Sequence, residues 1–448
     1  MRPSRAAATR RTAAGRTAAA RAVTVGSAAL AAALLLTACG SGSSGSADGG
    51  SGDGKVTLTV DLFGTFGFKE AGLYDEYMKL HPNVTVKQSD TQDEAQYWQA
   101  LQTKLAGGGG VADVQGLEVG RIASVMQKQA DKFQDLRSLG AGDVNDGLVP
   151  WKAAAVKTAD GKVLGAGTDI GPEAICFRAD LFKEAGLPTD RTELAAKWST
   201  WAGYLELGKE YVAKAKPGNA WTDSAAGMFT AEVGQQKVRF TDESGKAVHE
   251  SSPAVQTAWA DATKLVADGL SAKLPQWTPE WNKAFSTGKF ATLSCPAWMA
   301  GYIKGQAGDA FAGKWDIAPG PGKTGNWGGS YLAIPKAAKH PKEAAELIKW
   351  LNAKEQQVKL FTKQGSFPSS TAAQAEIKTV KDPYFNDAPI GEIFSESAVN
   401  MPAQVLGIQD GVVTKAFTDA LGEVERTNTA PATAWQHALD NVKKASGN

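Results

Sequence analysis

The sequence has 448 residues with 48 basic and 47 acidic side chains, a formal net charge of +1. The only charged residues among the first 38 are six arginines, so the chain that follows has 42 basic against 47 acidic side chains, a formal charge of −5. A mildly acidic body of this length excludes a typical nucleic-acid-binding protein, which carries a basic excess, and is long enough for two domains.

Residues 1–38 have the parts of an export signal. The six arginines precede an apolar segment over 22–36 and the tetrapeptide Leu36-Thr37-Ala38-Cys39. This pattern is typical of a signal peptide, and the apolar run is too short for a transmembrane helix, which needs about 20 apolar residues. Leu-Thr-Ala-Cys has the order of a lipobox, in which the chain is cut before Cys39 and that cysteine carries the lipids. The alternative is a plain secretory signal with an incidental cysteine.

A flexible tether follows the predicted cleavage site. Residues 39–54 are nearly all Gly, Ser, Ala and Asp, and such a segment behaves as a coil. We therefore expect lipids on Cys39 to hold the folded body on the outer, extracellular face of the cell membrane. Arg10-Arg11 has no bulky apolar residue directly after it, which favours general secretory export over the twin-arginine route.

Strands and helices are expected to alternate through the first part of the folded body. Alternating or apolar runs predict strands, and apolar residues near a period of 3.6 predict helices. The expected order is strand 56–60, helix 69–81, strand 84–86, helix 94–105, strand 111–117 and helix 120–129. This order predicts an α/β unit with a parallel sheet. Ligands bind outside the carboxyl ends of such strands, which indicates a site at loops 61–67, 89–93 and 116–118.

A second α/β unit is expected to begin near residue 165. The pattern predicts strands at 174–177, 290–294, 315–318 and 331–334, and helices at 178–185, 198–215, 254–268 and 340–352. The last sixty residues are predicted to be mostly helical. Cys176 and Cys295 each lie in an apolar, strand-like run, and outside the cytoplasm they either form a disulfide or remain two buried thiols.

Three segments carry recognisable sequence blocks. Residues 167–184 contain Gly-Thr-Asp, then Ala-Ile-Cys-Phe-Arg, then Phe-Lys-Glu; residues 285–298 run from Phe-Ser-Thr-Gly-Lys-Phe-Ala to Cys-Pro-Ala-Trp; residues 328–335 read Gly-Gly-Ser-Tyr-Leu-Ala-Ile-Pro. Together they resemble, in order, the blocks of the family 1 extracellular solute-binding proteins, the substrate-capture lipoproteins of ABC importers, which include maltose-binding protein. The first block departs from the family pattern at Thr168, Cys176 and Phe177-Arg178.

The resemblance implies a type II periplasmic-binding-protein-like fold, in which two α/β lobes joined by hinge strands close on a ligand. We expect lobe one to comprise residues 55–164 and 313–362, and lobe two residues 165–312 and 363–448. The implied protein is a monomer that delivers an oligosaccharide to the transmembrane subunits of an ABC permease and needs no cofactor or metal. Within the family, residues 171–178 are most similar to actinobacterial cello-oligosaccharide binders.

Aromatic side chains are the first candidates for sugar contacts, because flat rings stack on the apolar faces of sugars. The chain has 13 tryptophans, and Trp298 follows a predicted strand in a Pro-Ala-Trp turn. Trp327 precedes a glycine pair that lets the backbone approach a ligand closely. The full set of candidates from this region and others is Phe66, Trp221, Trp281, Trp298, Trp327, Gly328 and Ser330.

Each of these candidates has a structural alternative. Trp221 lies in a polar segment, which argues against core burial, whereas Trp277 and Trp281 are four residues apart and suit a core stripe equally well if helical. Of that pair we favour Trp281. The remaining tryptophans in helical patterns are expected in the core: Trp98, Trp198, Trp201, Trp259, Trp350 and Trp435.

Two carboxylates are the candidates for polar contacts to sugar hydroxyls. Asp169 comes just before the strand of the first block, in a loop that faces the cleft in the family, and Glu118 ends the third predicted strand. The alternative for both is an ordinary surface carboxylate. A buried hydroxyl without a partner costs about 1–3 kcal/mol, so such groups determine specificity.

Two other classes of function stay open from the residues alone. A lipid-anchored glycoside hydrolase needs two carboxylates across a cleft, which composition cannot exclude. However, the sequence has no G-x-S-x-G elbow, no H-E-x-x-H and no P-loop, and its four histidines are scattered, so no catalytic residues are predicted. A lipoprotein that only presents a ligand to a sensor, or an adhesin, is the third class.

Overall fold

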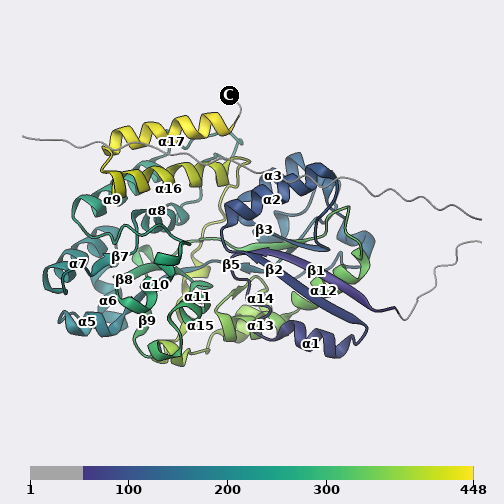
Figure 1. Cartoon of the computed structure of the whole chain (residues 1–448), viewed down its shortest axis with the longest axis horizontal. Helices are drawn as coiled ribbons and strands as arrows, with labels where there is room; N and C mark the ends of the chain where they lie inside the picture. Colours follow the sequence, from purple (N-terminus) through teal and green to yellow (C-terminus); the bar gives the residue numbers. More distant parts are fainter. Residues whose placement is uncertain (1–53, 447–448) are drawn as a thin grey trace, which may run out of the picture. The chain divides into compact units, whose positions relative to one another are not determined.

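The computed structural model of the protein describes residues 54–446 (Figure 1). The expected signal peptide, the lipidation site Cys39 and the tether up to residue 53 lie outside the described residues. In the part that the structure describes, no helix combines the length and the apolar character needed to cross a membrane.

The first sheet has five strands in the order β2-β1-β3-β10-β4. Strand β1 is parallel to β2 and β3, whereas β10 is antiparallel to both β3 and β4. The strands are β1 (Val56–Phe63), β2 (Val84–Thr91), β3 (Val114–Glu118), β10 (Ser330–Ala333) and β4 (Ala166–Gly167). The predicted parallel arrangement of the first three strands is therefore confirmed, and β10 reaches this sheet from far along the chain.

Local sequence signals determine where the connecting helices begin and end. Helix α1 (Leu73–Leu80) starts later than expected, because Gly72 takes a left-handed conformation with φ 76°. The Asp93 carboxylate accepts the amide of Gln96 and caps α2 (Glu94–Gly107), which ends at left-handed Gly108. Glu118 caps α3 (Val119–Lys128) in the same way. The starts of α2 and α3 therefore lie at the carboxyl ends of β2 and β3.

The second sheet has four strands in the order β7-β8-β6-β9. Strand β6 is antiparallel to β8 and β9, and β7 is parallel to β8. The strands are β7 (Ala220–Thr222), β8 (Phe290–Pro296), β6 (Glu173–Arg178) and β9 (Trp315–Ala318). The pairing of β9 with β6 corrects the expected transfer to the first unit at residue 313: buried Trp315 packs against Phe285 and Phe290, so the chain leaves the second sheet only after Ala318.

Two segments lead directly from one sheet to the other. Residues 168–172 connect β4 to β6, and residues 319–329 connect β9 to β10. The first of these segments contains β5 (Asp169–Ile170), which pairs with β11 (Phe367–Pro368). The two segments also meet each other, because the amide of Trp327 donates to the carbonyl of Gly171 at 2.9 Å. The two crossing segments are therefore hydrogen-bonded to each other.

The other helices surround these sheets. They are α4 (Pro150–Ala154), α5 (Ala179–Glu184), α6 (Arg191–Lys197), α7 (Trp201–Lys214), α8 (Ala225–Gly234), α9 (Pro253–Ala267), α10 (Pro279–Thr287), α11 (Met299–Ala307), α12 (Pro341–Leu351), α13 (Lys354–Gln364), α14 (Thr371–Ile377), α15 (Ile390–Val399), α16 (Asp410–Thr427) and α17 (Pro431–Ala445). Helices α16 and α17, drawn in yellow, lie side by side in Figure 1. Phe417 of α16 packs on Trp435 of α17 and stacks on Phe229 of α8. Helix α16 thus belongs to the core of the second sheet.

Cys176 on β6 and Cys295 on β8 are joined by a disulfide, with their Cα atoms 5.4 Å apart. Both residues are fully buried, and the bridge closes a loop with a sequence separation of 119. The two strands that it links lead directly to the crossing segment at 168–172 and to Trp298.

Loss of this disulfide should lower stability substantially. In the chain-entropy model, a cross-link over a loop of about 100 residues lowers the conformational entropy of the unfolded chain. This raises the free energy of unfolding by about 4–5 kcal/mol. We expect the Cys176→Ala/Cys295→Ala variant to unfold at a clearly lower urea concentration than the oxidised protein. The control is wild-type protein unfolded with reductant, which should approach the double variant; equal midpoints for all three samples would contradict the prediction.

Candidate functional site

A cavity of about 420 Å³ opens at the carboxyl ends of the first three strands. Its volume lies within the range of small-molecule sites. Each of the three loops expected from the parallel sheet contributes to the lining, through Phe63, Gly64, Thr65, Phe66, Gln92, Asp93 and Glu118. The opposite wall comes from the second unit, including α8, the loop before α10 and one face of α16, while the two crossing segments line it through Thr168, Asp169 and residues 326–330.

Three half-buried tryptophans line one side of the cavity. The rings of Trp298 and Trp327 are nearly perpendicular, with centroids 6.1 Å apart, and Trp277 lies 6.0 Å from Trp298. The Trp298 indole Nε1 donates to the carbonyl of Trp327 at 3.0 Å, which fixes its orientation. A fixed indole that lines the cavity presents a rigid apolar surface to a ligand.

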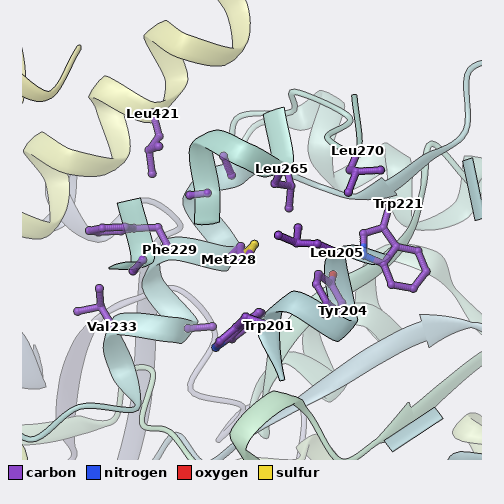
Figure 2. Packing of buried hydrophobic residues seen from close by; sticks show 14 of the residues in the cluster. Trp201, Tyr204, Leu205, Trp221, Met228, Phe229, Val233, Leu265, Leu270 and Leu421 are labelled. Carbon is purple, nitrogen blue, oxygen red and sulfur yellow. The ribbon is translucent and has the colours of Figure 1, made fainter. Parts of the chain in front are cut away.

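Trp221 and Trp281 do not reach the cavity, which corrects their predicted role as ligand contacts. Trp221 is fully buried on β7 and packs against Tyr204 and Phe182 in the core shown in Figure 2. Trp281 is also fully buried, and its Nε1 donates to Asp223 at 2.9 Å. The polar residues around Trp221 did not prevent burial, because the tryptophan lies on β7, a strand of the second sheet, and residues of the surrounding helices pack against it.

Trp277 lines the cavity, whereas we predicted that Trp281 would do so. The two residues do not share a helix, because α10 begins only at Pro279. Trp277 instead has a left-handed backbone with φ 70°, which is uncommon outside glycine. Its ring packs 5.0 Å from that of Trp281 and still lines the cavity.

Phe66 forms part of the wall and is not an exposed lid. Its side chain is only 7% exposed, and its ring lies 5.1 Å from that of Phe63 in an edge-on arrangement. The ring fills the space above Gly116, where an added Cβ would come within 3.0 Å of it. Phe66 therefore forms an apolar part of the wall next to β3.

Asp169 and Ser330 meet at the floor of the cavity. The Asp169 Oδ1 atom accepts from the Ser330 amide at 2.9 Å and from the Thr168 hydroxyl at 2.8 Å. No donor among residues 54–446 bonds to the other carboxylate oxygen of Asp169. This leaves that oxygen available to a hydroxyl of a ligand.

The glycine pair beside Trp327 allows the floor to pass close to the aromatic side. Gly328 has φ 86° and Gly329 has φ 105°, conformations that favour glycine. A Cβ on Gly328 would lie 3.2 Å from the Trp298 indole nitrogen. The pair thus combines an unusual backbone with close approach to Trp298; the predicted close approach to a ligand stays a prediction.

Glu118 lies where β3 ends and α3 begins. Its Oε2 accepts the amide of Gly120 at 2.6 Å, so the side chain caps α3 and lines the cavity at once. Burial and, to a smaller extent, the neighbouring Glu94 raise the pKa of Glu118 to about 7 against the opposing effect of Arg121. At neutral pH this carboxyl group can accept a hydrogen bond as the anion or donate one as the acid.

Charged side chains form a further wall of the cavity, and the sequence analysis did not predict it. Arg121 makes two hydrogen bonds to Glu94, at 3.0 and 2.8 Å, and Arg239 pairs with Asp410 at 3.1 Å. The remaining lining residues of this wall come from α16 at helical spacing: Asp410, Gly411, Thr414, Lys415, Thr418, Asp419, Gly422, Glu425 and Arg426. The available signal was the polar stripe opposite Val413, Phe417 and Leu421, a pattern that usually indicates a solvated face.

The donor set of the cavity suits a polar organic ligand. Among the described residues, no group of three or more His, Cys, Asp or Glu side chains has the proximity needed for a metal ion. Rigid indole faces, one free carboxylate oxygen and several charged side chains converge on a single space. Such a space can hold a ligand with both apolar faces and many hydroxyl groups.

The family model for bacterial extracellular solute-binding proteins matches residues 72–387, well over half of the chain. The chain belongs to this family. A crystal structure described as an extracellular solute-binding protein of family 1 shares 42% sequence identity with this solute-binding protein. The superposition has a TM-score of 0.72 and covers 87% of this chain and 99% of the other.

More distant relatives of the solute-binding protein have named ligands. An arabinooligosaccharide-binding protein of Bacillus subtilis is 24% identical over 295 residues, which cover 63% of this chain and 65% of the relative, just under two thirds of its length. A binding protein from B. animalis subsp. lactis, solved with β-1,6-galactobiose, is 23% identical, with a TM-score of 0.73 over 88% of this chain and 98% of the other. The fold is the two-lobed α/β fold of these binding proteins, as the sequence blocks indicated.

Proposed function

We propose that this solute-binding protein captures an oligosaccharide in the cavity and delivers it to the transmembrane subunits of an ABC permease. The observation that carries the proposal is the convergence of Trp277, Trp298 and Trp327 on the same space as Asp169. Indole faces suit the apolar faces of sugar rings, and a carboxylate oxygen suits their hydroxyls. The named ligands of two relatives, arabinooligosaccharide and β-1,6-galactobiose, support this class.

We infer that the ligand is a short oligosaccharide, of the cello-oligosaccharide class or a related one. A cavity of about 420 Å³ suits a ligand of a few sugar rings. The protein would act as a monomer without enzymatic activity, anchored through lipidated Cys39 to the outer face of the membrane. The lipids would keep the receptor beside its permease.

Capture would occur by closure of two lobes about the crossing segments. We propose that lobe one comprises residues 55–167 and the chain from about 319 to 362, and that lobe two comprises residues from about 168 to 318 and 363–448, because β4 (Ala166–Gly167) belongs to the first sheet. The cavity takes lining from both sets of residues, so a ligand would contact both lobes. A ligand shifts such a hinge equilibrium only by its differential affinity for the closed state.

A sugar panel tests the proposed function. The purified protein is mixed with cellotriose, xylotriose, arabinotriose, chitotriose, maltotriose and β-1,6-galactobiose, and its melting temperature and tryptophan fluorescence are measured. We expect at least one sugar to raise the melting temperature by several degrees and to change the fluorescence, because ligand binding stabilises the folded state. The sugar should be recovered intact by chromatography; shortened products would indicate a hydrolase, and no response to any sugar would reject the proposal.

A further inference from the structure

Lys152 on α4 lies beneath the floor of the cavity with its whole side chain buried. Its Nζ atom has no hydrogen-bond partner within residues 54–446. The atom lies 3.7 Å from the centre of the Tyr331 ring, so the ring of a β10 residue covers the ammonium from one side. An ammonium without hydrogen bonds is costly to bury, so the charged form of Lys152 needs a compensating interaction.

Two glycines make room for this lysine. A Cβ on Gly167 would come within 2.8 Å of the Lys152 Cγ atom, and a Cβ on Gly329 would come within 3.2 Å of Nζ. Gly167 ends β4 directly before Thr168, and Gly329 directly precedes Ser330. The lysine stem therefore runs along the segment that leads into Asp169, and its ammonium reaches the backbone that donates to Asp169.

The surrounding charges identify the compensating groups. Burial lowers the pKa of Lys152 to about 7, and the carboxylates of Asp169 and, to a smaller extent, Glu118 act in the opposite direction. Both carboxylates line the cavity, whereas Lys152 does not. The lysine thus lies behind two groups that face the ligand space, on the side away from the ligand.

We propose that Lys152 is a positioning residue for the sugar site: attraction from its buried ammonium holds Asp169 with one oxygen on the Ser330 amide and the other directed at the ligand. This inference rests on the proposed function for the identity of the ligand, but the positioning of Asp169 is a property of the ligand-free protein. The two parts can therefore be tested separately.

The first test measures hydrogen exchange of the Ser330 amide in the ligand-free protein. The substitution Lys152→Met keeps an unbranched stem and removes the charge. We expect the Ser330 amide to exchange about tenfold faster or more in K152M, because its acceptor Asp169 is no longer held. The matched control is K157M, an exposed lysine that follows the same helix, whose Ser330 exchange should equal that of wild type. Unchanged exchange in K152M would overturn the proposal.

The second test measures affinity for the panel sugars by calorimetry. For a sugar that binds wild type, the affinity of K152M should be about tenfold lower. Its melting temperature should stay close to that of wild type, because methionine keeps the buried stem and removes an ammonium that has no hydrogen-bond partner among the described residues. In the Asp169→Asn background, K152M should have no further effect. If K152M lowers the sugar affinity by the same factor in the wild-type and the Asp169→Asn backgrounds, Lys152 has a purely structural role and the proposal is rejected. If wild type binds no sugar while the exchange result holds, the proposed function fails and the positioning of Asp169 stands.

Discussion

Replacing Trp298 by alanine should reduce sugar affinity by about 100-fold, a loss of about 3 kcal/mol in binding free energy. The indole contributes a face to the cavity, contacts the rings of Trp277 and Trp327, and is oriented by its hydrogen bond to the Trp327 carbonyl. The substitution removes the stacking surface and also releases its neighbours. Isothermal titration with the best sugar of the panel measures the loss.

The control for this variant is Trp350→Ala. Trp350 is half-buried against Tyr77 in the core of the first sheet and does not line the cavity. We expect it to lower the melting temperature without changing sugar affinity. An affinity for W298A within twofold of wild type, with an intact fold by circular dichroism, would show that the ligand does not rest on this tryptophan.

Gly171→Ala should be among the most damaging single-methyl substitutions in the chain. A Cβ at this position would lie 1.9 Å from the carbonyl oxygen of Trp327 and 2.6 Å from its carbonyl carbon. Both are backbone atoms of the other crossing segment, held by the hydrogen bond from the Trp327 amide to Gly171. Relief of this overlap must move the two crossings apart, at a cost of about 3 kcal/mol or more in unfolding free energy.

The same movement should displace Trp327 and weaken sugar binding about tenfold. The matched control is Gly305→Ala, the same substitution in the interior of α11 where an added Cβ meets no atom within 4 Å. Alanine there should stabilise the protein by about 0.5–1 kcal/mol, because glycine is unfavourable inside a helix. Urea unfolding measures the free energy of unfolding of both variants, and calorimetric titration measures their sugar affinity. A G171A variant as stable as wild type would contradict the backbone contact.

The parallel part of the first sheet and the position of the cavity could be predicted from the sequence. Period-2 and period-3.6 patterns are strong between residues 56 and 129, and the geometry of parallel strands then requires the three loops to meet. Asp169 and Trp298, which line the cavity, were predicted as ligand contacts because they lie beside strand ends within blocks that resemble a family. In these segments the local sequence pattern and the tertiary fold favour the same structure.

The errors have a common physical cause, which is that exposure depends on contacts between distant segments. Trp221 lies among polar residues yet is buried, because helices from elsewhere in the chain cover β7. Trp277 reaches the cavity through a left-handed backbone that no periodicity reveals. The polar stripe of α16 resembles an ordinary solvated surface until the opposite wall of the cavity is known.

The position of β10 has a consequence for how the chain can be made. This strand fills the place between β3 and β4, although it lies at Ser330–Ala333. Until a ribosome has synthesised those residues, the emerging chain presents β3 as an open edge with unpaired backbone groups, a template for pairing with another chain. Products truncated before β10 should therefore aggregate or be degraded, and neither half of the sequence should be obtainable as a stable, separately expressed fragment.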